Sequence, residues 1–262
     1  MNHLMLLLNS VFVLSSVLMV LTWYIARRLK NYSIVDAVWA FGFFLVSVLL
    51  LVLAEGWTER KWLMVTVVSI WSLRLGLFLA RRIARHHPHE DNRYLELRKS
   101  YGESVEKGFF WFFQYQAWSI FLLSIPFVVM SMNKQDSIHL LEWLGAVITV
   151  LAVLGEGIAD HQKSTFKSVA ANRGKNCEVG LWRYSRHPNY FFESVVWFGI
   201  FLMIVPSPGG LFCFYVPLLM LYLLMKVTGV PMSEENSMKV YGDSYLEYQK
   251  KVSFFVPWFR KK

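Results

Sequence analysis

Seven stretches of the chain are almost continuously apolar, with polar segments between them. A helix of about 20 residues crosses the hydrocarbon core of a bilayer, and each stretch is long enough or nearly so. The expected spans are residues 4–26, 34–54, 62–83, 110–131, 140–160, 189–206 and 209–229. The last two meet at the turn residues from Val205 to Gly210, which forces an antiparallel pair. The pattern predicts an all-α polytopic membrane protein with seven transmembrane helices.

The basic residues favour one orientation of this bundle. They collect after the first apolar stretch, in residues 81–109 and 161–188, and in the C-terminal tail, whereas the opposite segments hold Arg60, Lys61 and Lys134. Because Lys and Arg accumulate in cytoplasmic loops, the N-terminus is expected outside and the C-terminus in the cytoplasm. The N-terminus has no basic region or cleavage site typical of a signal peptide, so the first stretch is expected to remain as a helix.

Composition supports this assignment. Of the 262 residues, 55% are hydrophobic, which favours a single integral-membrane domain over residues 1–262. The net charge of +9 comes from the loops, so no nucleic-acid partner is expected. Cys177 and Cys213 suggest neither a disulfide framework nor a metal site. The histidines of residues 86–89 lack supporting carboxylates, so no metal is expected there either.

The segment from Gly180 to Tyr190 combines basic, aromatic and amide side chains at the entry to an apolar helix. Pro188 suits the first position of that helix, and the free N–H groups after it would attract phosphate or carboxylate. A basic loop facing lipid headgroups is the alternative. That alternative explains the arginines but not the alignment of further polar side chains, namely His187, Asn189, Tyr190 and Glu193.

Another polar group lies at the end of the fifth stretch. Helical spacing places Asp160, Lys163 and Lys167 on one side, with Glu156 one turn before Asp160. This set could hold a ribose hydroxyl and phosphates. An ordinary helix end, with lysines reaching the headgroups, fits the same pattern.

Two further charged residues lie within the apolar stretches, where charge is costly and often functional. Asp36 either caps its helix together with Ser33 or faces the pocket as a proton donor or substrate anchor. Arg74 is too deep to reach the surface easily and is expected to pair with Asp36, Glu156 or Glu193. A structural ion pair and a substrate clamp are both consistent with Arg74.

The tail after Gly229 has the pattern of an ordered segment. Ser233 precedes two glutamates, and the spacing of Met238, Tyr241, Tyr245 and Tyr248 predicts a short amphipathic helix against the bundle.

These residues together resemble a known family: bacterial membrane proteins related to the steroid 5-alpha-reductase C-terminal domain. The resemblance covers nearly the whole chain. It rests on these segments: Val35 to Trp39, Trp71 to Leu75, Glu90 to Tyr94, Asp160 to Phe166, Asn172 to Lys175, Gly180 to Tyr190 and Tyr245 to Lys251.

The resemblance implies a seven-helix bundle that binds NADPH from the cytoplasmic side through a half covering about residues 140–262. In that family a hydride passes from the nicotinamide to an enone carbon while an acidic group polarises the carbonyl. By position, the cofactor-binding residues would be Asp160, Lys163, Lys167, Arg173, Arg183, Tyr184, Arg186, His187, Asn189, Tyr190, Glu193, Glu235 and Tyr245. The implied substrate is a steroid-like or other lipid-like small molecule in a bacterial inner membrane.

The catalytic half departs from the family pattern. Steroid reductases use a Glu on the second helix and a Tyr on the third, whereas this chain offers Asp36 on the second and Trp71 and Arg74 on the third. The candidate catalytic residues are therefore Asp36, Tyr94 and Arg74, and a steroid substrate does not follow.

Two other functions compete with the reductase. Membrane methyltransferases that act on isoprenylcysteine or phospholipids, and that use S-adenosylmethionine, share a similar Arg-His-Pro-x-Tyr segment and paired glutamates like Glu234 and Glu235. The seven stretches and the matches in the N-terminal half favour the reductase over them. A helical membrane protein without enzymatic activity is the third hypothesis.

Overall fold

The computed structural model describes residues 2–260, and the regular secondary structure in that range is helical apart from one isolated bridge between Ser185 and Ser253. The α-helices are α1 (His3–Leu29), α2 (Ile34–Leu53), α3 (Thr58–His86), α4 (Asn92–Tyr101), α5 (Val105–Ser131), α6 (Leu140–Ser168), α7 (Pro188–Ile204), α8 (Tyr215–Tyr222), α9 (Val230–Tyr241) and α10 (Asp243–Lys251). Short 3-10 helices are η1 (Gly102–Ser104), η2 (Ala170–Asn172), η3 (Gly180–Arg183) and η4 (Gly210–Phe214), and the π-helix η5 spans Leu223–Val227.

The chain forms two compact units. Unit 1 comprises Met1–His139 and Ile204–Cys213, and unit 2 comprises Leu140–Met203 and Phe214–Lys262. Each unit is described by itself.

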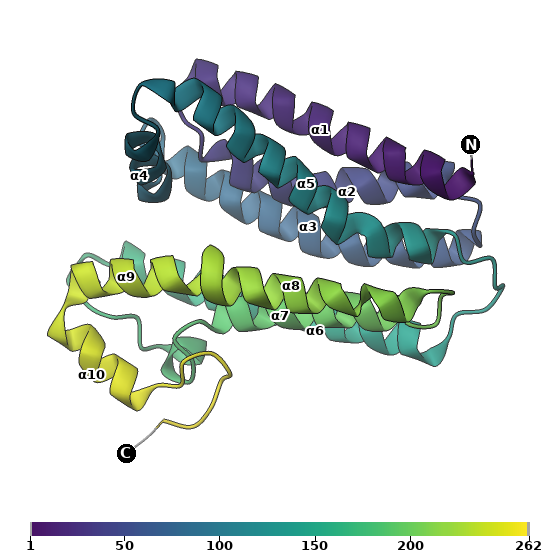
Figure 1. Ribbon diagram of the computed structural model, residues 1–262. Helices are drawn as coiled ribbons and strands as arrows, with labels where there is room; N and C mark the ends of the chain where they lie inside the picture. Colours follow the sequence, from purple (N-terminus) through teal and green to yellow (C-terminus); the bar gives the residue numbers. More distant parts are fainter. Residues whose placement is uncertain (1, 261–262) are drawn as a thin grey trace. The chain divides into compact units, whose positions relative to one another are not determined.

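Unit 1 is a bundle of the four long helices α1, α2, α3 and α5, with α4 across one end (Figure 1). Its core is aromatic: Phe43 and Trp71 pack with ring centroids 5.2 Å apart, and both are fully buried. Tyr32 stacks on Phe109 at 3.8 Å near the end that carries α4. These contacts give that end of the bundle a rigid base.

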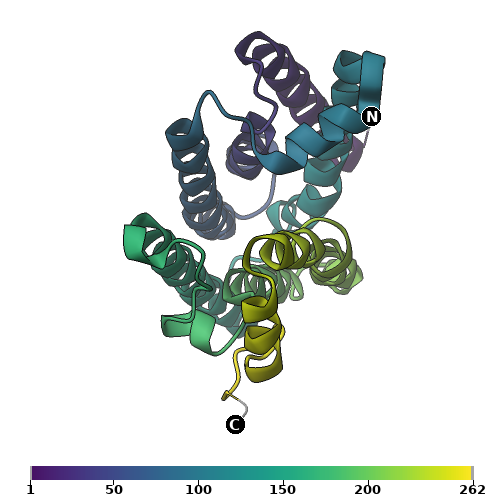
Figure 2. The ribbon, with the colours of Figure 1, turned by 90° about the vertical axis from the view of Figure 1, so that its left-hand side faces the viewer.

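Unit 2 contains α6, α7 and α8, which run side by side and are seen end-on in Figure 2, followed by α9 and α10. Helices α6 and α7 approach closely because glycines face each other. A Cβ on Gly145 would lie 2.5 Å from the carbonyl oxygen of Gly199, and a Cβ on Gly199 would lie 2.4 Å from the Thr149 hydroxyl. Small residues at such contacts let helix backbones pack tightly in a membrane.

Six helical stretches of the described chain are long and apolar enough to cross a membrane: His3–Leu29, Ile34–Leu53, Thr58–His86, Asn92–Ser131, Leu140–Ser168 and Gly210–Tyr241. The sixth expected span corresponds to Pro188–Ile204, an apolar helix of 17 residues that falls below that length. The expectation of an all-helical protein with long apolar helices is confirmed, and the count by length and composition is six.

The C-terminal part of unit 2 differs in detail from the expectation. The expected span 209–229 is divided into η4, α8 and η5, and the expected single tail helix is two helices, α9 and α10, separated at Gly242. Gly242 adopts φ +53°, a left-handed conformation that ends a helix readily when the residue is glycine. The tyrosine pattern does pack as expected, because Tyr245, Tyr248 and Val252 form a buried cluster covered by Met238 and Tyr241.

Candidate functional site

Unit 2 contains a cavity with a basic lining. Its volume is about 70 Å³, and four cationic side chains line it: Lys163, Lys167, Lys175 and Arg186. The other lining residues are Phe166, Asn176, Cys177, Trp182, Ser233, Asn236, Ser237, Tyr241, Tyr245 and Tyr248, with no carboxylate among the lining residues of the described chain. An adjoining cavity of about 390 Å³ shares Phe166, Lys175 and Asn176 with it. The chemistry of the lining suits a polyanion that also carries flat rings.

The segment before α7 is held in place from two sides. The Trp182 indole donates a hydrogen bond to the carbonyl of Ala159 on α6 (2.8 Å). The C-terminal segment pairs with it on the other side, since the Arg186 amide donates to the Ser253 carbonyl (2.9 Å) and the Ser185 hydroxyl donates to the Phe255 carbonyl (2.6 Å). Pro188 begins α7, as its missing N–H allows. Arg186 and His187 are therefore fixed at the entry of that helix.

Glu234 on α9 is the centre of the polar contacts in unit 2. Arg186 Nη1 donates to its Oε2 (2.7 Å), and His187 Nε2 lies 2.6 Å from its Oε1. From α10, the Tyr245 hydroxyl donates to Oε1 and the Gln249 amide donates to Oε2, each at 2.6 Å. This one carboxylate thus joins α9 and α10 to the segment before α7.

The electrostatics around Glu234 define the protonation of its partners. Burial lowers the pKa of His187 below 6.5, and the charges of Lys163 and Arg186 act in the same direction, while Glu234 opposes them. His187 is therefore neutral at pH 7 and donates its Nε2–H to Glu234. Burial also raises the pKa of Tyr245, so its hydroxyl remains a donor at that pH.

Three buried polar atoms near this segment suggest that a ligand completes the site. Arg186 Nε, Asn176 Oδ1 and Asn189 Oδ1 have no hydrogen-bond partner within residues 2–260. Arg186 and Asn176 line the cavity. Because a buried polar atom without a partner is costly, a polar ligand that supplies one would stabilise the site.

The residues that the sequence assigned to a cofactor are not all in one place. Lys163, Lys167, Arg186 and Tyr245 line the cavity. Lys163 Nζ lies 4.0 Å from the centroid of the Trp182 ring, and Asp160 is buried on the same helix. Arg173, Arg183 and Tyr184 are exposed around it.

The remaining assigned residues occupy α7 and α9. The Tyr190 ring stacks on His187 with centroids 5.8 Å apart, and Glu193 accepts a hydrogen bond from the Trp197 indole (2.9 Å). Glu235 is exposed and forms an ion pair with Lys239 at 2.7 Å. Glu235 was expected among the cofactor-binding residues, whereas its neighbour Glu234 makes the contacts described above. Adjacent residues of a helix point in directions about 100° apart, so Glu234 and Glu235 lie on different faces of α9.

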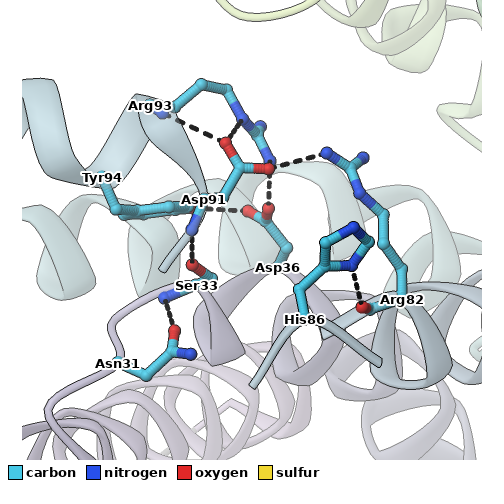
Figure 3. Close-up of polar contacts among 8 residues, drawn as sticks. All are labelled: Asn31, Ser33, Asp36, Arg82, His86, Asp91, Arg93 and Tyr94. Atoms are coloured by element: carbon cyan, nitrogen blue, oxygen red, sulfur yellow. Dashed lines mark hydrogen bonds and ion pairs between the residues drawn. The ribbon is translucent and has the colours of Figure 1, made fainter. Parts of the chain in front are cut away.

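A second polar cluster lies at the α4 end of unit 1 (Figure 3). The Tyr94 hydroxyl donates to Asp36 Oδ1 (2.5 Å), and Arg93 Nη2 donates to Asp36 Oδ2 (2.8 Å). Tyr94 is buried, whereas a quarter of the Asp36 side chain is exposed. The structure brings together two of the three candidate catalytic residues, Asp36 and Tyr94.

Asp91 supports this pair from the start of α4. Its carboxylate accepts from Arg93 Nε (3.0 Å) and from Arg82 Nη2 (2.7 Å). Burial favours the protonated form, but the hydrogen bond of Arg93 and the charges of Arg93 and Arg82 outweigh burial and hold the pKa of Asp91 below 3.8. Ser33 accepts a hydrogen bond from the Asp91 amide (2.9 Å) and makes no side-chain cap bond to α2. The capping hypothesis for Ser33 is therefore wrong.

Arg74 lies apart from this cluster along α3. It precedes Arg82 by eight residues, which is about 12 Å along a helix axis. Its side chain is partly buried.

Sequence reasoning missed several residues of both sites. Glu234, Asn176 and Arg93 carry contacts that no spacing rule indicated, since each depends on a loop or on the angle between helices. The one sequence feature that pointed to Glu234 was its position beside Glu235 in a pair of glutamates.

Comparison with known proteins gives two matches. A family model described as "Protein of unknown function (DUF1295)" matches residues 22–252. A protein of Schizosaccharomyces pombe, "Uncharacterized protein C594.04c", is 24% identical over 216 residues, which are 73% of this chain. The chain spans 61% of that relative's length. No solved structure matches the chain.

Proposed function

The chain belongs to the DUF1295 family of steroid 5-alpha-reductase-like membrane proteins, and on that premise we propose that it is a membrane reductase that uses NADPH to reduce an activated carbon–carbon double bond. The substrate class is a lipid-like enone. The site is proposed to face the cytoplasm of a bacterial inner membrane. The observation that carries the proposal is the cationic cavity of unit 2.

Charge distinguishes the two candidate cofactors. NADPH carries a diphosphate and a 2′-phosphate, whereas S-adenosylmethionine carries a positive sulfonium. Three lysines line the cavity together with Arg186, whose charge Glu234 partly offsets, and this basic lining favours the polyanion. Trp182, Tyr245 and Tyr248 would offer ring faces to the bases.

The residues of unit 2 fit a phosphate-rich ligand in a specific way. Arg186 keeps Nη1 on Glu234 and has a buried Nε still to be satisfied, so the guanidinium is oriented before any ligand arrives. Lys163 and Lys167 would add charge without fixed geometry. NADPH, when bound, would supply the hydride for the β-carbon of the enone, and the α-carbon would take a proton.

The polar cluster of unit 1 has the chemistry of a hydrogen-bond donor to a carbonyl. Tyr94 has one hydroxyl hydrogen, which Asp36 accepts. Donation to a substrate carbonyl therefore requires the hydroxyl to turn from Asp36, and Arg93 stabilises the carboxylate that it leaves. A donor at the carbonyl would stabilise the enolate formed by hydride addition.

Side-by-side binding of NADPH and S-adenosylmethionine to the detergent-purified protein tests the cofactor. NADPH alone should raise the thermal unfolding temperature. Lys167→Gln, at an exposed cavity residue, should weaken NADPH binding by about threefold to tenfold, since it removes one charged contact. Lys250→Gln removes the same charge on an exposed part of α10 and should leave affinity unchanged. Stabilisation by S-adenosylmethionine alone would replace the reductase with the methyltransferase.

Replacement of Tyr94 tests the catalytic half. Tyr94→Phe keeps the ring beside Phe112 (5.9 Å) and removes the hydroxyl. Turnover, followed as NADPH oxidation with an enone found by screening, should fall by about 100-fold, the usual contribution of a positioned acid, with NADPH affinity unchanged. Tyr101→Phe at the end of the same helix is the control. Equal turnover in both variants would remove Tyr94 from the mechanism.

A further inference from the structure

We infer that α9 is a lid over the cationic cavity, hinged at Gly229 and Gly242 and latched by Glu234. The inference builds on the proposed function for the identity of the ligand, but its geometry and its test do not depend on NADPH.

The size of the cavity is the first observation. The cavity beside α9 measures about 70 Å³, which holds a few water molecules, whereas the adjoining cavity measures about 390 Å³ and small-molecule pockets about 300–1,000 Å³. Residues of α9 form part of the cavity wall and limit the space beside Lys163 and Arg186. Four of the lining residues belong to α9 itself: Ser233, Asn236, Ser237 and Tyr241. A ligand that reaches Lys163 and Arg186 would therefore displace α9.

The packing of α9 is lighter than that of α10. Val230 is its one buried residue in the described structure, and its other apolar contact is the cover that Met238 and Tyr241 give to the tyrosine cluster of α10. By contrast, α10 buries Tyr245 and Tyr248, and the Tyr248 hydroxyl donates to the Trp182 carbonyl (2.5 Å). Movement is expected in α9, with α10 remaining on the body of unit 2.

Both ends of α9 are built for a change of direction. Gly242 has φ +53°, a left-handed conformation that glycine adopts without the steric cost of a side chain. At the other end, Gly229 follows the π-helix η5, and a Cβ on it would approach the Leu224 carbonyl oxygen to 2.8 Å. Single π turns within helices are frequent at functional sites.

Glu234 supplies the latch because it connects α9 to the fixed elements on both sides. Arg186 and His187 hold it from the segment before α7, and Tyr245 and Gln249 hold it from α10. Hydrogen bonds to a charged acceptor are about twice as strong as neutral ones. Glu235, one residue later, makes its ion pair within α9 and contributes nothing to closure.

Cys177 provides a natural reporter of the lid. It lines the cavity together with residues of α9 and is 9% exposed, and burial raises the pKa of its thiol. A water-soluble maleimide should therefore modify it slowly while the lid is closed. Cys213 is the other cysteine and is replaced by Ala so that labelling reports Cys177 alone.

The test compares Cys177 labelling in the full-length protein, Glu234→Gln and Glu235→Gln, without nucleotide. Loss of the charged acceptor should raise the open population and the labelling rate about tenfold or more in Glu234→Gln. Glu235→Gln should label like the parent. Equal rates in all three proteins would overturn the latch.

A measurement on the parent protein covers the case in which Glu234→Gln does not fold. Hydrogen exchange should be faster in residues 230–241 than in α7 and α10. Protection of α9 equal to that of α7 would overturn the lid. Failure of NADPH binding with fast exchange in α9 would instead reject the proposed function and leave the lid in place.

Discussion

Glu90 and Asp91 are adjacent carboxylates in unit 1 with different environments. The Glu90 side chain is 4% exposed and accepts from the Tyr32 amide (2.5 Å) and from Arg98 (2.8 Å). Asp91 is 19% exposed, and its partner Arg82 is half exposed. Solvent screens the Arg82 pair, whereas Glu90 relies on Arg98 for neutralisation.

This difference predicts unequal costs for two similar replacements. Arg98→Met would leave Glu90 buried and uncompensated, which costs about 3–5 kcal/mol of unfolding free energy. Arg82→Met would remove a largely solvated contact, and Asp91 would keep Arg93, so the cost should stay below about 1 kcal/mol. Thermal unfolding of both variants in the same detergent measures the difference. Similar shifts would show that Glu90 does not depend on its partner.

At the residue scale, the sequence identified which charged side chains matter better than it identified their partners. Arg60 and Lys61 were assigned to an outer loop by charge counting, yet both are buried. Arg60 Nη1 donates to the Gln135 carbonyl (2.5 Å), and Lys61 Nζ donates to the Ala54 carbonyl (2.7 Å). They satisfy backbone carbonyls at the ends of neighbouring segments, which is a three-dimensional relation that charge counting does not detect.

At the element scale, hydropathy located the helices, while their ends depended on capping and backbone conformation. The second helix was expected over 34–54 and is Ile34–Leu53. The fifth stretch was expected to end at 160, but α6 continues to Ser168, because the polar residues after Asp160 remain helical outside the apolar pattern. That extension places Lys163 and Lys167 on the cavity.

The tail shows why periodicity alone could not predict that α9 ends at Gly242. The tyrosine spacing continues in phase from Met238 to Tyr248 and predicts one helix. A single left-handed residue, Gly242, divides it, and the two halves then pack very differently. Glycine permits this conformation without requiring it, so the break was not predictable from the pattern.

At the scale of the whole molecule, the two candidate sites lie in different compact units and have different electrostatic designs. Unit 1 holds its carboxylates with arginines, and the pKa of Asp91 lies below 3.8. Unit 2 contains a buried neutral imidazole, His187, whose pKa lies below 6.5. The two units should therefore lose stability in different ranges of acid pH.

The direction follows from proton binding in the folded and unfolded states. Between the lowered pKa of His187 and 6.5, the unfolded chain binds more protons than the folded one, so stability in unit 2 falls as pH drops below about 6.5. Asp91 gives the same sign at lower pH, since its contribution to stability is complete above about 3.8 and is lost as pH falls through its lowered pKa.

Hydrogen exchange corrected for intrinsic rates should show residues 182–190 loosening at pH 5.5 while residues 90–101 keep their protection. His187→Gln should abolish the change in unit 2 between pH 7 and 5.5. Simultaneous loosening of both segments at pH 5.5 would mean that a group other than His187 controls the acid response, and the neutral imidazole would then have no part in holding Glu234 and the lid in place.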